Sequence, residues 1–261
     1  MQRYHQENFH PPGMTFLTEV TAARWIEQGT NHRSRGIDAL IPAGFAAHAR
    51  LFHPADNVSD STPETRVRWS EVAKWSGRTV HPLMAFERIK VPATGFGVEP
   101  APWSYDPDEE LYDVGIVLGD FLTGYTDTPQ DCFFGIWEGY GHLGVGGMFM
   151  MSTNGGVPLS PPAEVLSAER FICDDWEYLL YRGALDAMDS FYTLPIWCNL
   201  PNIWWPSDRA WFVMSHYDLD STYIAGSEEC IQALLQHPSF EVLPVAANAP
   251  FGWGQDQVNL S

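Results

Sequence analysis

The sequence predicts an α+β fold in which helices pack on a mixed, mainly antiparallel sheet. Candidate helices and strands follow one another along the 261 residues without the regular strand–helix–strand rhythm of a doubly wound fold. The candidate strands alternate in polarity instead of forming continuous apolar runs, which favours antiparallel pairing. Hydrophobic residues make up 45% of the chain, enough to build a large core.

The N-terminal third is expected to begin as an irregular arm over residues 1–14, because His10-Pro11-Pro12-Gly13 interrupts any regular element. Short elements separated by loops should follow. Glycines at positions 29 and 77 should end the two helices among them. The predicted elements, in chain order, are a helix at residues 18–28, a strand at 45–52, a polar loop at 55–65, a helix at 70–75 and an extended segment at 81–89.

A Pro- and Gly-rich connection at residues 92–107 is the best candidate for a boundary between two halves. It contains Phe96 and Trp103. Such aromatic side chains indicate a loop that packs against the body of the protein rather than a free linker. We therefore expect one α+β domain over residues 1–261, with at most a weak subdivision near 92–107.

The strongest helix signal of the chain begins at Asp106. This residue is a good N-cap, Pro107 suits the first helical position and Glu109 the third. Gly124 is expected to end the helix. Between these ends, apolar residues recur at helical spacing: Leu111, Val114, Leu118, Phe121 and Leu122.

The rest of the chain is expected to supply most of the sheet. The predicted strands are residues 132–137, 144–151, 176–181, 210–217 and 242–245, with a short helix at 185–191. A last helix, residues 228–236, should begin after Ser227 as its N-cap and stop before His237-Pro238. The tail from Ala246 onward is expected to be weakly structured.

The charge balance limits the classes of partner. The chain has 33 acidic and 14 basic residues, a formal net charge of −19. Such a chain repels nucleic acid and anionic membrane surfaces, and it suits a basic protein partner or a cationic ligand. High acidity also serves solubility alone. No segment has the length of a transmembrane helix and the N-terminus lacks the apolar run of a signal peptide, so a soluble cytoplasmic protein is expected.

Familiar catalytic and metal-binding motifs are missing from the sequence. The four cysteines, at positions 132, 173, 198 and 230, lie far apart and form no C-x-x-C pair, so we expect buried thiols. The glycines at 139–147 are not followed by the Lys-Ser/Thr of a phosphate-binding loop. G-x-S-x-G, H-E-x-x-H and EF-hand patterns are also missing. No cofactor and no metal are therefore predicted.

The densest aromatic stretch, PNIWWPSDRAWFV at residues 201–213, is the main candidate for a ligand site. Trp204 and Trp205 are adjacent, so an extended backbone points them to opposite sides, and one of them is expected to face outward. Beside it, Asp208 and Arg209 should pair with each other or cap backbone groups, and Arg209 is able to stack on an indole. The structural alternative is an aromatic corner that anchors the strand through Trp211.

Charged and aromatic residues elsewhere are expected to edge the same tryptophan-walled pocket. Asp218 and Asp220 lie on one side of an extended segment, where paired carboxylates bind cations or transfer protons, although the surrounding residues are also typical of a turn. The predicted ligand-binding residues are Glu138, Tyr140, Trp204, Trp205, Asp208, Arg209, Asp218 and Tyr223.

Four strings in the sequence resemble a family of uncharacterised bacterial proteins: RWSEVAKWSGRTVHPLM, TPQDCFFGIWEGYG, PNIWWPSDRAWFV and DLDSTYIAGS. These pieces are spread over most of the chain, and the W-W-P-x-D-R-A-W pattern is fairly specific. The family has no established activity. The resemblance therefore implies a soluble bacterial protein and no particular catalytic residue.

Three functions fit the sequence. The first is an acidic interaction protein, immunity-type or regulatory, that binds a basic partner. The second is an enzyme or small-ligand binder whose tryptophan-walled pocket is edged by carboxylates and an arginine. The third is a metal-dependent hydrolase, whose ligands would have to converge through the fold from His48, His53, His81, His142 and a carboxylate. The sequence predicts neither the oligomeric state nor whether the chain is catalytic.

Overall fold

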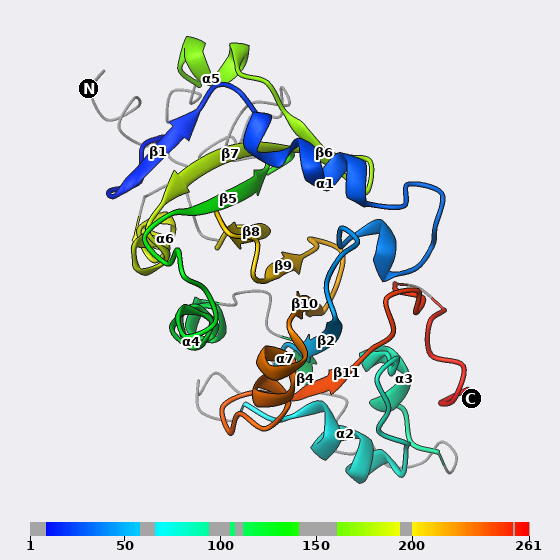
Figure 1. Cartoon of the computed structure of the whole chain (residues 1–261). Coiled ribbons are helices and arrows are strands. Elements are labelled where there is room, and N and C mark those ends of the chain that lie inside the picture. Colours follow the sequence, from blue (N-terminus) through cyan, green and yellow to red (C-terminus); the bar gives the residue numbers. More distant parts are fainter. Residues whose placement is uncertain are drawn as a thin grey trace, which may run out of the picture.

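A computed structural model describes residues 9–57, 66–93, 105–107, 112–140, 161–193, 200–252 and 254–260. These residues form a large antiparallel sheet with helices on both faces, together with a small two-stranded sheet (Figure 1). The predicted α+β fold class is confirmed. Every pairing between the described strands is antiparallel. No helix in these ranges is long and apolar enough to cross a membrane.

The large sheet has nine strands, eight of which follow one path. Their order is β1 (Met14–Leu17), β7 (Trp176–Gly183), β5 (Cys132–Trp137), β8 (Ile203–Pro206), β9 (Phe212–Ser215), β10 (Ser221–Gly226), β2 (Ala47–Phe52) and β11 (Val242–Pro244). The ninth, β6 (Phe171–Cys173), pairs with the first residues of β7, while β1 pairs with its last residues. The small sheet joins β3 (Ala55–Asn57) to β4 (Tyr105–Pro107).

Alternating side chains of the strands enter two separate cores, one on each face of the sheet. On the first face lie α4 (Tyr112–Thr123), α6 (Ser190–Thr193) and α7 (Glu228–Leu235) (Figure 1). Trp204 and Trp211 meet edge to face in this core, with ring centroids 5.4 Å apart. The Trp211 indole N–H donates to the carbonyl of Leu122 at 3.1 Å, which ties the sheet to the last turn of α4.

The opposite face is covered by the N-terminal segment, which contains the 3₁₀ helix η3 (Thr21–Ala23), α1 (Arg24–Gly29) and η4 (Ile37–Ala39). Trp205 lies in this second core, where its ring stacks on Phe133 at 5.4 Å and on Phe212 at 6.1 Å. Trp204 and Trp205 therefore point to opposite faces, as the extended backbone of β8 requires.

A third core lies beside β2, between α2 (Trp69–Ser76) and α3 (Phe86–Ile89). Arg50 is buried here and links β2 to β10 and to the segment before α3. Its guanidinium donates to the Ser221 hydroxyl at 2.8 Å and to the carbonyls of Pro82 and Met84 at 3.0 and 2.8 Å. The Trp69 indole N–H donates to the carbonyl of His53 at 2.7 Å. Two further short helices are α5 (Ala163–Ser167) and η7 (Leu185–Ala187).

Many of the predicted elements are present. The strand at 132–137 coincides with β5, and Ser227 caps α7 by accepting a hydrogen bond from the Cys230 amide at 3.1 Å. Gly77 follows α2 with φ of 71°, a left-handed conformation that suits glycine. The helix at 18–28 forms as η3 and α1, the helix at 185–191 as η7 and the start of α6, and the strands at 45–52, 176–181, 210–217 and 242–245 as β2, β7, a shorter β9 and β11.

Two predictions about residues 81–107 are wrong. Residues 81–89 are not extended, because a turn closes from the Met84 amide to the His81 carbonyl at 3.1 Å and α3 follows. Asp106 does not cap α4, because it lies in β4 and pairs with Asp56. Both errors have the same cause: partners distant in the sequence, residues 256 and 55–57, compete with the local signal.

Strands β1, β3, β4, β6, β8 and β10 were not predicted, and β3 lies in the segment 55–65 that was expected to be a polar loop. The residues of β8 (IWWP) and β10 (STYIAG) look like a corner and a helix approach when taken alone, yet both strands are buried on both faces. Cys132, Cys173 and Cys230 are buried thiols as expected, and burial raises the pKa of Cys132 and of Cys230 to about 12. Cys198 and the predicted strand at 144–151 lie outside the described residues.

Candidate ligand-binding cavity

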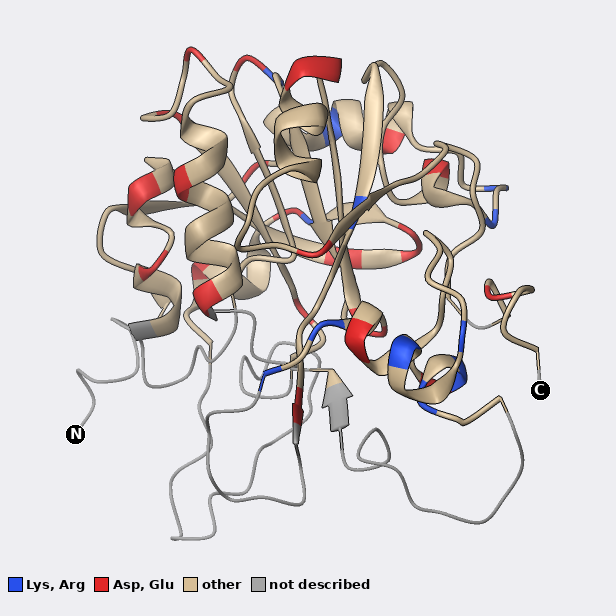
Figure 2. Cartoon of the chain, turned by 90° about the horizontal axis from the view of Figure 1, so that it is seen from below, with Lys and Arg blue, Asp and Glu red and all other residues tan. Residues whose placement is uncertain are grey.

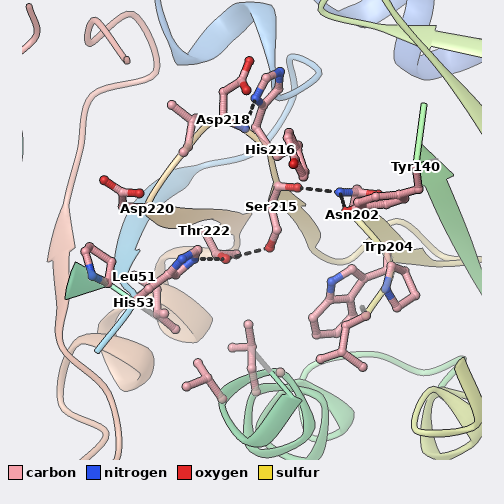
Figure 3. A pocket seen from close by; sticks show the side chains of 18 residues that line it. Leu51, His53, Tyr140, Asn202, Trp204, Ser215, His216, Asp218, Asp220 and Thr222 are labelled. Atoms are coloured by element: carbon pink, nitrogen blue, oxygen red, sulfur yellow. Dashed lines mark hydrogen bonds between the residues drawn. The ribbon is translucent and has the colours of Figure 1, made fainter. Parts of the chain in front are cut away.

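A cavity of about 380 Å³ lies on the first face of the sheet, where β8, β9 and β10 meet α4 (Figure 3). One side of it is apolar and is formed by Leu51, Val114, Leu118, Leu200 and Trp204. A polar wall faces this side and is formed by His53, Asn202, Ser215 and Thr222. The remaining exposed or half-buried polar residues of the lining, which we call the rim, are Tyr140, Tyr217, Asp218 and Asp220.

The hairpin between β9 and β10 supplies seven of the eighteen described lining residues. Ser215 and Thr222 are direct partners across the two strands, so their side chains emerge on the same face. The turn between them closes from the Leu219 amide to the His216 carbonyl at 3.0 Å, and the Asp218 amide donates to the His216 ring at 3.1 Å. Tyr217, Asp218 and Asp220 are therefore held outside the strands, exposed at the rim.

Three side chains of the polar wall form a continuous row of hydrogen bonds (Figure 3). The imidazole Nε2 of His53 lies 3.0 Å from the Thr222 hydroxyl, which lies 2.6 Å from the Ser215 hydroxyl. Burial and, to a lesser degree, the Arg50 guanidinium lower the pKa of His53 to about 3. A general base works best with a pKa near the operating pH, so this neutral imidazole suits hydrogen bonding far better than proton abstraction.

Asn202 fixes the other end of the polar wall. Its side-chain carbonyl accepts from the Trp137 amide at 2.9 Å, and its amide donates to the Tyr140 hydroxyl at 2.9 Å and to the Ser215 carbonyl at 3.2 Å. The side chain is only 4% exposed. One buried amide thereby connects β5, β9 and the rim, and the wall is shaped before any ligand arrives.

The close approach of α4 sets the width of the cavity. Gly115 faces Leu200, and a Cβ atom added at Gly115 would lie 2.0 Å from Leu200 Cδ1. A larger residue at position 115 would therefore push Leu200 aside, and Leu200 itself lines the cavity. The glycine allows the helix to pack against the segment before β8 while leaving the cavity open.

The charges around the cavity have one sign at neutral pH. Asp218 and Asp220 lie at the rim, and none of the described lining residues is a lysine or an arginine. His216 is also part of the lining; burial lowers its pKa, against a smaller opposite effect of Asp174, whose carboxylate lies 3.7 Å from Nε2. With both histidines neutral, the described lining carries only negative charge.

The structure brings three of the predicted site residues together around this cavity: Tyr140, Trp204 and Asp218. The others lie elsewhere. Glu138 forms an ion pair with Arg170 at 2.7 Å, and Trp205 and Tyr223 are buried in the core of the opposite face. The prediction that Trp204 or Trp205 faces outward is wrong, because their exposed fractions are 2% and 1%. Trp204 is buried in the first core, on the α4 side of the sheet, and Trp205 in the second core, under the N-terminal segment.

Asp208 and Arg209 form a turn at the end of β8 and have structural contacts. Asp208 accepts hydrogen bonds from the Asp127 and Ala210 amides at 2.8 and 3.0 Å, so it caps backbone groups, one of the two predicted roles. The Arg209 guanidinium lies over the Trp25 ring at 4.6 Å. Arg209 thus stacks on an indole as predicted, although the indole comes from α1 and not from the 204–211 cluster.

The described residues contain no group of three His, Cys, Asp or Glu side chains placed to hold a metal ion. His53 forms a hydrogen bond with Thr222, whereas His81 lies 2.9 Å from the Asp256 carboxylate. The two histidines therefore have different partners and share no ligand. Of the other two histidines considered as metal ligands, His48 belongs to no such group and His142 lies outside the described residues. The hydrolase hypothesis therefore finds no ligand set in this part of the chain.

The sequence did not point to Leu51, Asn202, Ser215 or Thr222, and it pointed to His53 only as a possible metal ligand. A hairpin centred on residues 216–220 would have paired Ser215 with Thr222, but β10 was not recognised as a strand. Leu51 and His53 carry no local signal, because they join the cavity only through the pairing of β2 with β10.

Comparison with protein-family models, with curated proteins and with solved structures found no match to this chain.

Proposed function

We propose that this protein binds a small molecule in the cavity beside Trp204. The observation that carries the proposal is the cavity itself, whose volume of about 380 Å³ falls in the range of roughly 300–1,000 Å³ common for small-ligand sites. Ligand sites combine an apolar surface with a few well-placed polar groups. This cavity has both: its apolar side faces its polar wall.

The hydrogen bonds of the polar wall support binding over catalysis. Asn202 and the His53–Thr222–Ser215 row hold the wall in one arrangement, which reduces the entropy lost when a ligand is bound. The Ser215 hydroxyl is the nearest candidate for a nucleophile, but the imidazole in its row is a weak base. A binding protein that uses these groups as hydrogen-bonding partners is the simpler function.

Filling the cavity tests this function. Val114 and Val117 both lie on α4; Val114 lines the cavity and Val117 does not. Fragments found by ligand-observed NMR should bind to wild-type protein, lose at least about tenfold in affinity with Val114→Phe, and keep their affinity with Val117→Phe. Equal affinity for the two variants would place the binding elsewhere and refute the proposal, as would a screen that finds no fragment.

A second candidate is an acidic protein that binds a basic partner, favoured by the net charge of −19. Asp and Glu residues are distributed over helices and loops on several sides of the described chain (Figure 2). The acidic residues are thus not gathered on one described element, which ranks the interaction protein below the small-ligand binder. Recovery of a defined basic partner from a bacterial lysate, released by salt, would reverse that order.

A further inference from the structure

We infer that the ligand of this cavity is an organic cation, a protonated amine or a quaternary ammonium ion that carries an apolar group. The inference rests on the proposed small-molecule binding and names the chemical class of the ligand. Three features of the lining carry it: the sign of its charge, the aromatic residues of the rim and the apolar side beside Trp204.

The first feature is the charge. Asp218 and Asp220 lie on the turn between β9 and β10, and the described lining contains no lysine or arginine. The buried Arg50 interacts electrostatically with Asp220 but lies outside this lining. The imidazoles of His53 and His216 are buried, which keeps them neutral at pH 7. Carboxylates around a hollow with low-dielectric walls raise the local concentration of cations and repel anions.

The second feature is the pair of tyrosines at the rim. The rings of Tyr140 and Tyr217 lie at 79° with centroids 5.7 Å apart, and both contact Trp137, at 5.2 and 5.0 Å. Tyr217 is 59% exposed and is held next to Asp218 by the turn. Aromatic ring faces attract cations, and rings combined with carboxylates recognise ammonium groups.

The third feature is the apolar side. Leu51, Leu118 and Trp204 are buried residues that line the cavity below the rim. An ammonium group at the rim would place its apolar substituent against these side chains, where burial of apolar area stabilises the complex. A fully hydrated inorganic cation would leave this surface unused.

A neighbouring cavity of about 290 Å³ provides an internal comparison. It shares Leu51 and Val114 with the first cavity, but it contains Arg66 and Arg68 as well as Asp113 and Glu241. Its charges are mixed and mutually satisfied: Arg66 pairs with Asp113 at 3.3 Å, and Glu241 accepts from the Trp69 and Ser70 amides. Of these two cavities, the first is therefore the one expected to prefer cations.

Three probes of similar size and different charge test the inference: phenethylamine, phenethyl alcohol and phenylacetate. Methyl NMR distinguishes the two cavities, because Leu118 lines only the first and Val67 only the second. We expect phenethylamine to shift the Leu118 methyls, phenethyl alcohol to bind about tenfold more weakly and phenylacetate to leave these methyls unchanged. Raising the NaCl concentration should weaken only the amine.

Variants at the rim complete the test. The double substitution Asp218→Asn/Asp220→Asn should reduce phenethylamine affinity about tenfold and leave phenethyl alcohol unaffected. The control Asp186→Asn/Asp189→Asn changes the net charge equally at two exposed positions outside the cavity, and it should retain amine binding. Equal loss in both double variants would assign the effect to net charge and overturn the inference.

The outcomes separate this inference from the proposed function. If phenethyl alcohol or phenylacetate moves the Leu118 methyls as strongly as the amine does, the cavity binds small molecules but the cation class is wrong. If no probe moves them, the cation inference and the small-molecule function both fail. Amine shifts confined to Val67 would also overturn the inference, because they would place the site in the second cavity.

Discussion

Asp256 shows how one residue fixes a segment without regular secondary structure. Its side chain is 1% exposed, and its carboxylate accepts hydrogen bonds from the amides of Ala85, Val258 and Asn259 and lies 2.9 Å from His81 Nε2. The tail from Ala246 has few regular elements, in line with its composition. This buried carboxylate nevertheless attaches the tail to His81 and Ala85, and the Asn259 side chain attaches it to Thr79.

The Asp256 carboxylate should stabilise the fold only where it is ionised. Burial would raise the pKa of Asp256, but the hydrogen bonds from Asn259, Ala85 and Val258 outweigh burial, and the net change is a lowered pKa. A carboxyl group whose pKa is lower in the folded than in the unfolded chain contributes stability above its unfolded pKa of about 3.9. That contribution is lost as the pH falls through the folded pKa.

Asp256→Asn should therefore lower the free energy of unfolding by about 2–3 kcal/mol at pH 7, because an amide replaces acceptors with donors among buried N–H groups. Urea unfolding at a series of pH values measures this. The difference from wild type should shrink below about pH 4, where the wild-type carboxyl is increasingly protonated. An unchanged difference between pH 7 and pH 3 would contradict the role of the charge.

At the scale of elements, α4 links the core to the cavity. Its buried Leu118 and Leu122 pack on the first face of the sheet, and its glycines allow close approach to neighbouring segments. A Cβ atom at Gly115 would meet Leu200 at 2.0 Å, whereas one at Gly119 would meet the flexible end of Met188 at 3.3 Å and Leu185 at an ordinary contact distance of 4.0 Å. The two glycines of one helix therefore give different expectations for the same substitution.

Gly115→Ala should weaken fragment binding in the cavity about tenfold with little change in stability, because the gain of about 1 kcal/mol in helix propensity offsets the repacking of Leu200. Gly119→Ala should raise the free energy of unfolding by up to about 1 kcal/mol and leave binding intact. Denaturant unfolding and NMR titration measure the two quantities. Loss of binding in both variants would show that the cavity depends on α4 as a whole and not on position 115.

Several elements were predictable because their signals are local. The cap at Ser227, the stop at Gly77 and the apolar run of β5 each depend on a few consecutive residues. Strand β10 was not predictable in this way. Its polar start, Ser221-Thr222, is buried only because β2 and β9 lie on either side of it.

At the scale of the whole molecule, the two edge strands of the large sheet come from opposite ends of the chain. Strand β1 lies at one edge of the strand order and β11 at the other, while the central strands come from the C-terminal half (Figure 1). This connectivity places Leu51, Leu118 and Trp204 in one cavity although they are far apart in the sequence. Long-range pairing of this kind has no counterpart in local sequence patterns.

The net charge of −19 should make the stability of the whole molecule depend on salt. Repulsion among like charges destabilises a compact chain, and added salt screens it. Raising NaCl from 0.01 to 0.3 M should increase the melting temperature by roughly 2–5 °C, equivalent to about 1 kcal/mol. Calorimetry at constant pH measures this; a decrease would mean that exposed ion pairs such as Arg182–Asp131 outweigh the repulsion.

The α+β class, the positions of several helices and strands, the acidic character and the burial of three cysteines could be predicted from the amino-acid sequence alone. These properties follow from composition, periodicity and capping, which act over a few residues. The burial of both Trp204 and Trp205, and the cavity that Tyr140, Trp204 and Asp218 share, became visible in the folded chain. Burial and proximity depend on which strands pair, and that pairing is set by the core as a whole.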